Sequence, residues 1–100
     1  MRSLSRFRGC LLGGAAGDAL GYSVEYLDRQ QIEERYGKDG ILGYDLTNDI
    51  ALISDDTQMT LFTANGLLLG KTRMCMRGET APYAGYLAVA YRDWYRTQRR

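Results

Sequence analysis

Ser54-Asp55-Asp56-Thr57 is the stretch that organises the rest of the chain. Two adjacent carboxylates and two hydroxyls stand there, where an extended stretch gives way to a helical one. Adjacent like charges repel each other, and either the positive end of a helix or a bound hard cation would offset that repulsion. Ser, Asp and Thr are also residues that cap helices well. The tetrapeptide therefore predicts a helix start, and on its own it favours a cap over a metal site.

The composition limits the chemistry that the chain can perform. Its 100 residues make at most one small domain, and a formal net charge of +1 gives no general attraction to nucleic acid. Histidine is absent, which excludes Ser-His-Asp and Cys-His catalysis as well as histidine-ligated zinc. Cys10 and Cys75 lie far apart and support neither a disulfide framework nor a zinc ribbon. We expect a reducing compartment.

The N-terminal region has some features of a targeting or membrane segment. Basic residues precede an apolar run over residues 10–16, but the run is rich in glycine and alanine and Asp18 follows soon after. Such a run is weak as a secretory signal and too short to span a bilayer. We therefore expect a cytoplasmic protein with no membrane partner.

Glycine recurs at every fourth position, at Gly9, Gly13 and Gly17 of a helix predicted over residues 5–20 and at Gly21, which is expected to end that helix. Residues four apart share a helix face, so these positions form a stripe almost without side chains. Each glycine lowers helix propensity by about 1 kcal/mol relative to alanine, which suggests a compensating gain. We expect another backbone to approach the stripe closely; a flexible Gly/Ala segment is the alternative.

The remaining pattern is also helical, so the predicted fold class is all-α with long irregular loops. Asp28 opens a helix that ends at Gly37, with Gln31 as its capping-box partner. An irregular connection, with room for brief strands, covers residues 38–53. A strongly apolar helix is predicted over residues 57–69, followed by a connection over residues 70–78.

The last helix is predicted to begin at Thr80-Ala81-Pro82, because proline is tolerated in a first helical turn. Its apolar residues recur at helical spacing and form one stripe, which consists of Tyr83, Tyr86, Leu87, Ala90, Tyr91 and Trp94. The arginines that follow are typical of a solvated helix end, where cations are favourable.

Residues 66–72, Gly-Leu-Leu-Leu-Gly-Lys-Thr, resemble a phosphate-binding loop. The true pattern has four residues between its glycines, whereas three stand here, and no strand precedes them. Leucines are also poor residues for a loop whose amides must face phosphate. The segment favours a helix C-terminus with Gly70 as its cap.

The carboxylates are the stronger candidates for chemistry. Asp18, Glu25, Asp55 and Asp56 would converge if the first helix packed on the helix that follows Thr57. Asp55 and Asp56 would then bind a cation, with the Ser54 hydroxyl as a further oxygen ligand. Glu25, on a loop, is placed to act as a general acid or base. Without histidine, a metal and a carboxylate are the most plausible catalytic tools.

These residues resemble the ADP-ribosylglycohydrolase family, which includes the dinitrogenase-reductase-activating glycohydrolases. Two blocks carry the likeness, and Trp94-Tyr95-Arg96-Thr97-Gln98 adds to it. The first block is residues 9–21, Gly-Cys-Leu-Leu-Gly-Gly-Ala-Ala-Gly-Asp-Ala-Leu-Gly, continued to Val24-Glu25. The second is residues 54–60, Ser-Asp-Asp-Thr-Gln-Met-Thr. The likeness spans nearly the whole chain, and the two blocks in this order are quite specific.

The resemblance implies an all-α hydrolase that removes ADP-ribose from modified proteins or related conjugates by cleaving a glycosidic bond. It implies a binuclear Mg²⁺ or Mn²⁺ centre, for which Ser54, Asp55 and Asp56 match the N-terminal metal ligands. Glu25 matches a loop glutamate with a role in catalysis or in positioning substrate and metal. The expected partner is an ADP-ribosylated protein or an ADP-ribose conjugate, with no nucleic acid.

The resemblance also implies that residues 1–100 are the N-terminal portion of a single such domain. In the family, a second ligand motif of the Asp-x-Asp-Ser/Thr type and the segments that hold ADP-ribose lie farther along the chain. We therefore expect these residues alone to be inactive and marginally folded, with apolar helix faces exposed.

Two other interpretations stay open at this point. One is a catalytically inactive binding or structural protein of the same fold, and the other is a small helical interaction module. The presence of Glu25, Asp55 and Asp56 favours the enzyme.

Overall fold

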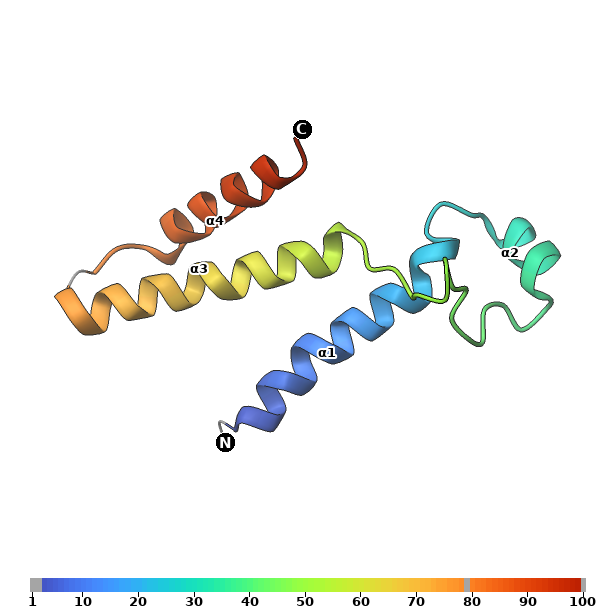
Figure 1. Ribbon diagram of the computed structural model, residues 1–100, viewed down its shortest axis with the longest axis horizontal. Helices are drawn as coiled ribbons and strands as arrows, with labels where there is room; N and C mark the ends of the chain where they lie inside the picture. The colour runs from blue at the N-terminus through green and yellow to red at the C-terminus, as the bar shows by residue number, and fades with distance from the viewer. Residues whose placement is uncertain (1–2, 79, 100) are drawn as a thin grey trace. The chain divides into compact units, whose positions relative to one another are not determined.

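The described chain is helical, as predicted. In the computed structural model, which describes residues 3–78 and 80–99, the regular elements are four α-helices and one short 3₁₀ helix (Figure 1). By its internal contacts the chain divides into two compact units, Met1–Thr57 and Gln58–Arg100. The first unit holds the candidate site, and the second is a helical hairpin.

The first helix, α1 (Leu4–Gly21), agrees closely with the predicted range. Ser3 caps it, because its side chain accepts a hydrogen bond from the Arg6 backbone N–H at 3.3 Å. Gly21 has a φ of −78°, so it does not end the helix through a left-handed conformation. Instead the chain tightens into the 3₁₀ helix η1 (Tyr22–Val24), which carries it directly to Glu25.

The predicted close approach to the glycine stripe of α1 is wrong for the described chain. A Cβ built on Gly9, Gly13, Gly17 or Gly21 would meet no atom within 4 Å. These glycines therefore give no packing gain among the described residues that would compensate for their low helix propensity.

We expect Gly13→Ala to increase the helicity of the present chain, by about 1 kcal/mol of helix propensity, because the added methyl group meets nothing. Far-ultraviolet circular dichroism of wild type and variant measures this change. A loss of helical signal in the variant would show that another backbone does approach the stripe.

The second helix, α2 (Arg29–Tyr36), has the predicted ends. Asp28 and Gln31 form a complete capping box, with the Gln31 N–H donating to Asp28 Oδ1 at 2.9 Å and the Asp28 N–H donating to Gln31 Oε1 at 3.0 Å. Gly37 follows the helix with a φ of +91°, a conformation that favours glycine. These local signals suffice to define α2, which is why the sequence predicts it well.

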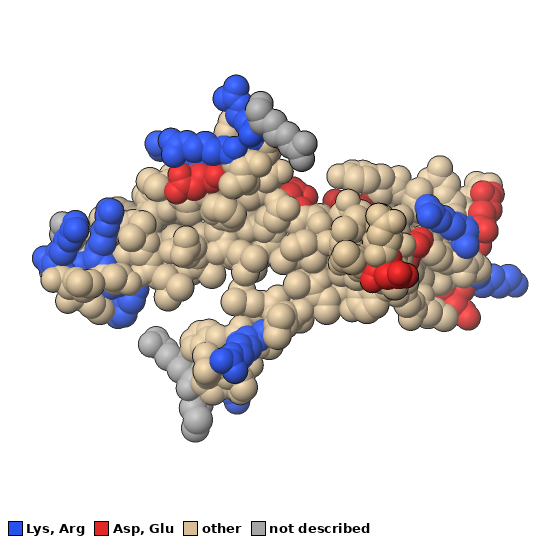
Figure 2. Space-filling model, in the orientation of Figure 1, with Lys and Arg blue, Asp and Glu red and all other residues tan. Residues whose placement is uncertain are grey.

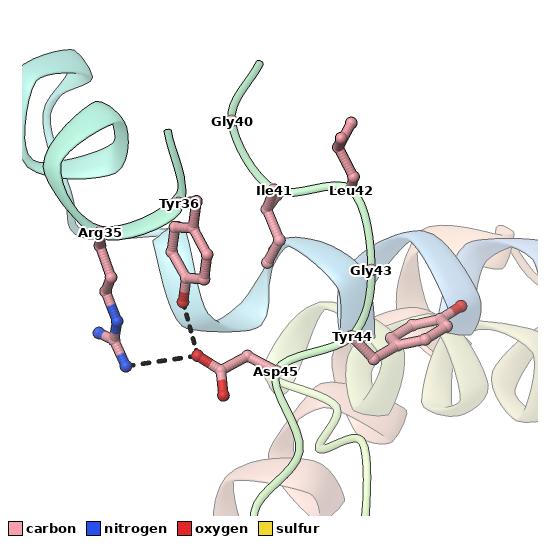
Figure 3. Close-up of a pocket in the computed structure, with 8 residues that line it drawn as sticks. All are labelled: Arg35, Tyr36, Gly40, Ile41, Leu42, Gly43, Tyr44 and Asp45. Atoms are coloured by element: carbon pink, nitrogen blue, oxygen red, sulfur yellow. Dashed lines mark hydrogen bonds and ion pairs between the residues drawn. The ribbon is translucent and has the colours of Figure 1, made fainter. Parts of the chain in front are cut away.

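The loop after α2 is anchored to the helix by a small polar network (Figure 3). The Tyr36 hydroxyl donates to Asp45 Oδ2 at 2.6 Å, and the Arg35 guanidinium lies 3.3 Å from the same oxygen. Arg35 and Tyr36 line a concavity of about 500 Å³ together with residues 40–45. The Arg35 and Asp45 side chains are exposed, so their ion pair contributes little to stability, and the network links the loop to the end of α2.

The rest of the 38–53 connection is irregular, as predicted, with one tight turn. Thr47 and Ile50 exchange two backbone hydrogen bonds across Asn48-Asp49. Asn48 and Asp49 have φ values of +51° and +64°, and asparagine and aspartate tolerate this left-handed region better than most residues.

The second unit is a hairpin in which α3 (Asp55–Arg77) and α4 (Tyr83–Thr97) lie antiparallel, side by side (Figure 1). The pairing of sequence-distant residues defines this direction. Trp94 Nε1, late in α4, donates to Gln58 Oε1, early in α3, at 3.1 Å. The first turn of α3 belongs to the first unit by its contacts.

Close helix packing does occur, but at glycines of α3. A Cβ on Gly66 would lie 3.1 Å from the Ala90 Cβ and 3.2 Å from the Tyr86 carbonyl oxygen. A Cβ on Gly70 would lie 2.9 Å from Tyr86 Cδ2. Gly66 and Gly70 are four residues apart and share one helix face, so this pair lets α4 approach α3 closely.

Two predictions about this region are therefore corrected. Gly70 does not cap a helix, and residues 70–77 are not a connection, because α3 continues to Arg77. The segment that resembles a phosphate-binding loop, residues 66–72, lies inside this helix. The last helix begins close to the predicted position, with Pro82 as its N-cap.

The buried core is small. Among the described apolar side chains only Tyr86 and Ala90 are buried, whereas Leu12, Leu42 and Met76 are 69%, 82% and 80% exposed. Most of the surface visible in Figure 2 carries neither acidic nor basic side chains, and basic ones gather at the end of α3. Within the described residues, no helix combines the length and the apolar character needed to cross a bilayer.

Candidate functional site

The site is built on the start of α3. Ser54 directly precedes the helix, and its Oγ accepts a hydrogen bond from the Asp56 backbone N–H at 3.0 Å. This is an N-cap interaction, so the capping interpretation of the tetrapeptide is confirmed. The cap uses the Ser54 hydroxyl and backbone amides, and it leaves the carboxylates of Asp55 and Asp56 on exposed residues.

Asp18, near the end of α1, holds this helix start in place. Its Oδ1 accepts from the Ser54 hydroxyl at 2.7 Å. Its Oδ2 accepts from the Ser54 N–H at 2.8 Å, from the Thr57 N–H at 3.3 Å and from the Thr57 hydroxyl at 2.6 Å. A single carboxylate thus binds residues on both sides of Asp55-Asp56, although 36 residues separate Asp18 from Ser54.

Electrostatics explain why an aspartate is favourable at position 18. The C-terminal end of α1 carries partial negative charge and disfavours a carboxylate, whereas the N-terminal end of α3 carries partial positive charge and favours it. Burial alone would raise the pKa of Asp18, but the hydrogen bonds from Thr57 and Ser54 outweigh that effect and lower the pKa from its ordinary value of 3.8. Asp18 is therefore ionised at neutral pH.

Ser54 and Thr57 are the buried members of the site, whereas Asp55, Asp56 and Glu25 are exposed. Ser54 and Thr57 are 9% and 7% exposed, respectively. Asp55 and Asp56 are exposed in the first turn of α3, and Glu25 is exposed at the end of η1. Asp18 does meet the start of α3, at Ser54 and Thr57, but the described residues do not bring three or more of the predicted carboxylates together closely enough to hold a metal ion.

The donor set is suited to a hard cation but is only partial. One hydroxyl and two carboxylates on consecutive residues are the oxygen ligands that Mg²⁺ and Mn²⁺ prefer. Residues 3–78 and 80–99 contain no group of three or more acidic, histidine or cysteine side chains close enough to hold a metal ion. Ser54, Asp55 and Asp56 therefore form at most one side of a metal centre.

Thr57 is the member of the site that the sequence analysis placed only as a helix starter. Its hydroxyl makes the shortest hydrogen bond to Asp18. The sequence signal for this role is the position of Thr57, three residues after Ser54. A polar side chain there, in the first helical turn, can hydrogen-bond to a neighbouring group. The identity of that group, on a distant helix, required the structure.

The described residues form an all-helical fold, and the candidate site gathers oxygen donors at the start of α3. The model of the family described as ADP-ribosylglycohydrolase matches residues 1–100. The chain therefore belongs to the ADP-ribosylglycohydrolase family, which is a family of glycohydrolases. Neither the curated proteins nor the solved structures give a significant match to this chain.

Proposed function

We propose that the protein hydrolyses the glycosidic bond of ADP-ribosylated proteins or related ADP-ribose conjugates in a metal-dependent reaction. Membership of the ADP-ribosylglycohydrolase family supports the reaction class. The observation that carries the metal dependence is the start of α3, where the Asp18 hydrogen bonds hold Ser54 in place and leave Asp55 and Asp56 exposed. We place this activity in the cytoplasm.

Ser54, Asp55 and Asp56 would hold Mg²⁺ or Mn²⁺ as one side of a binuclear centre, and residues outside the present chain would complete it. Such cations orient ribose hydroxyls and a water molecule and stabilise charge as the glycosidic bond breaks. The Asp18 carboxylate keeps the ligand-bearing backbone in one conformation through Ser54 and Thr57.

We assign to Glu25 the transfer of a proton to or from a reacting group, or the positioning of substrate. Its exposed carboxylate directly follows the 3₁₀ helix η1, so it is accessible to a substrate. The α1–η1 segment that precedes Glu25 carries Asp18, which ties it to the start of α3.

Removal of metal tests the proposal. The complete gene product, treated with EDTA and dialysed, is expected to lose release of ADP-ribose from ADP-ribosyl-arginine protein, ADP-ribosyl-serine peptide or O-acetyl-ADP-ribose. Addition of Mg²⁺ or Mn²⁺ should restore it. Chromatographic measurement of free ADP-ribose follows the reaction. Release of ADP-ribose that persists in EDTA would contradict metal dependence. A protein that binds metal but hydrolyses none of these substrates would favour a binding protein of the same fold.

A further inference from the structure

We propose that Asp18 is a positioning residue that orients the Ser54 hydroxyl so that it presents a lone pair, and not its proton, to the cation. This inference rests on the proposed function, because it assumes that Ser54 is a metal ligand. It concerns a residue of α1, whereas Ser54 precedes α3 and Asp55 and Asp56 begin it, and Asp18 is not itself assigned as a ligand.

The hydrogen bonds of Ser54 leave one orientation for its hydroxyl. A serine hydroxyl has one proton and two acceptor lone pairs. A carboxylate can only accept, so the 2.7 Å contact between Ser54 Oγ and Asp18 Oδ1 requires the Ser54 proton to lie between them. The Asp56 N–H occupies one lone pair at 3.0 Å. One lone pair therefore remains, and no proton is left to point along it.

The two oxygens of Asp18 have separate tasks. Among the described residues, Oδ1 accepts from the Ser54 hydroxyl, whereas Oδ2 accepts from the backbone of Ser54 and from Thr57. Asparagine has the same shape and keeps one acceptor oxygen, which can retain the contacts of Oδ2. Its NH₂ group then faces Ser54 Oγ and donates to it, so the hydroxyl proton must turn elsewhere. Asp18→Asn thus reverses the hydroxyl while it preserves the anchor of the helix.

Binding of Mn²⁺ to the complete gene product, followed by isothermal titration calorimetry, tests the inference. We expect Asp18→Asn to raise the Kd by about 10- to 100-fold, the usual effect of removing a partner that orients a metal ligand. On a Ser54→Ala background, where no hydroxyl remains to be oriented, the same substitution should change the Kd by no more than about twofold. A purely structural role of Asp18 would instead give the same loss on both backgrounds, and that result would overturn the inference.

Thr63→Val is the matched control, because it removes a part-buried hydroxyl of α3 that lies outside the site and hydrogen-bonds to the Met59 carbonyl oxygen and the Tyr91 hydroxyl. It should lower the unfolding temperature and leave the Mn²⁺ Kd within about twofold of the wild-type value. If Thr63→Val weakens binding as much as Asp18→Asn, the effect of Asp18 is one of general stability, and the inference is wrong.

The remaining outcomes separate this inference from the proposed function. A wild-type protein that binds no Mn²⁺ would overturn both. Wild-type binding that Asp55→Ala abolishes and Asp18→Asn leaves unchanged would overturn the positioning role alone. If Asp18→Asn does not fold, Ser54→Ala decides the question, since unchanged Mn²⁺ binding in that variant would show that Asp18 has no liganding hydroxyl to orient.

Discussion

Asp55→Ala is expected to reduce kcat/KM for ADP-ribose release by the complete gene product by more than about 100-fold. The loss of a direct ligand should exceed the 10- to 100-fold effect typical of residues that only support a ligand. Asp55 takes no part in the hydrogen bonds that Asp18 makes to Ser54 and Thr57. The variant should therefore fold, and it loses only about 0.3–1 kcal/mol of favourable interaction with the positive end of α3.

A matched control for this variant is Asp39→Ala, which removes an exposed carboxylate from the loop after α2. It changes the net charge by the same amount and should leave kcat/KM unchanged. Activity of Asp55→Ala within a few-fold of the control would remove Asp55 from the site. Equal loss of activity and of folded protein in Asp55→Ala would show that its role is structural.

Gly66→Leu is expected to destabilise the α3–α4 hairpin by about 1–3 kcal/mol, the usual cost of overpacking. Even a Cβ at Gly66 would lie 3.1 Å from the Ala90 Cβ and 3.2 Å from the Tyr86 carbonyl oxygen. Ala90 is buried and the carbonyl belongs to a helix backbone, so neither can move aside easily. Replacing glycine also raises helix propensity by about 1 kcal/mol. The cost of overpacking equals or exceeds this gain over its expected range.

The single tryptophan provides a local probe of this effect, because Trp94 on α4 binds Gln58 on α3. Denaturant unfolding of the present chain, followed by Trp94 fluorescence, should show a lower midpoint for Gly66→Leu. Gly85→Leu is the control within the same hairpin, since a Cβ at Gly85 meets nothing within 4 Å. A midpoint for Gly66→Leu at or above that of Gly85→Leu would contradict the close packing of α3 and α4.

The elements that the sequence predicted well are those with local signals. Asp28, Gln31 and Gly37 define α2 through contacts within a few residues, and they define it correctly. The predicted apolar stripe on α4 agrees with the structure at the centre of the helix, where Tyr86 and Ala90 are buried. Periodicity alone sufficed there, because one helix face carries the apolar residues.

The errors come from glycines whose role depends on distant neighbours. Gly70 has the local appearance of a helix end, but Tyr86 packs over it and α3 continues through it. Gly13 and Gly17 have the spacing of a close helix contact, yet a Cβ there meets no described atom. The spacing of glycines shows that one helix face carries almost no side chains. It does not show which other segment, if any, packs on that face.

The candidate site was predictable in part. The Ser54 cap follows from residue type and position. The hydrogen bond that the Thr57 hydroxyl donates to Asp18 joins residues 39 positions apart, and no local rule predicts such a pair. The metal ligands and Glu25 remain predictions from the family resemblance and from the chemistry of oxygen ligands.

The most direct test of the account is the binding of Mn²⁺ to the complete gene product, measured by electron paramagnetic resonance of the free ion. Wild-type protein should lower the concentration of free Mn²⁺, and the double variant Asp55→Ala/Asp56→Ala should not. The circular dichroism spectrum of the double variant should remain that of a folded helical protein. Equal Mn²⁺ binding by the wild type and the folded double variant would contradict the assignment of the start of α3 as the metal site.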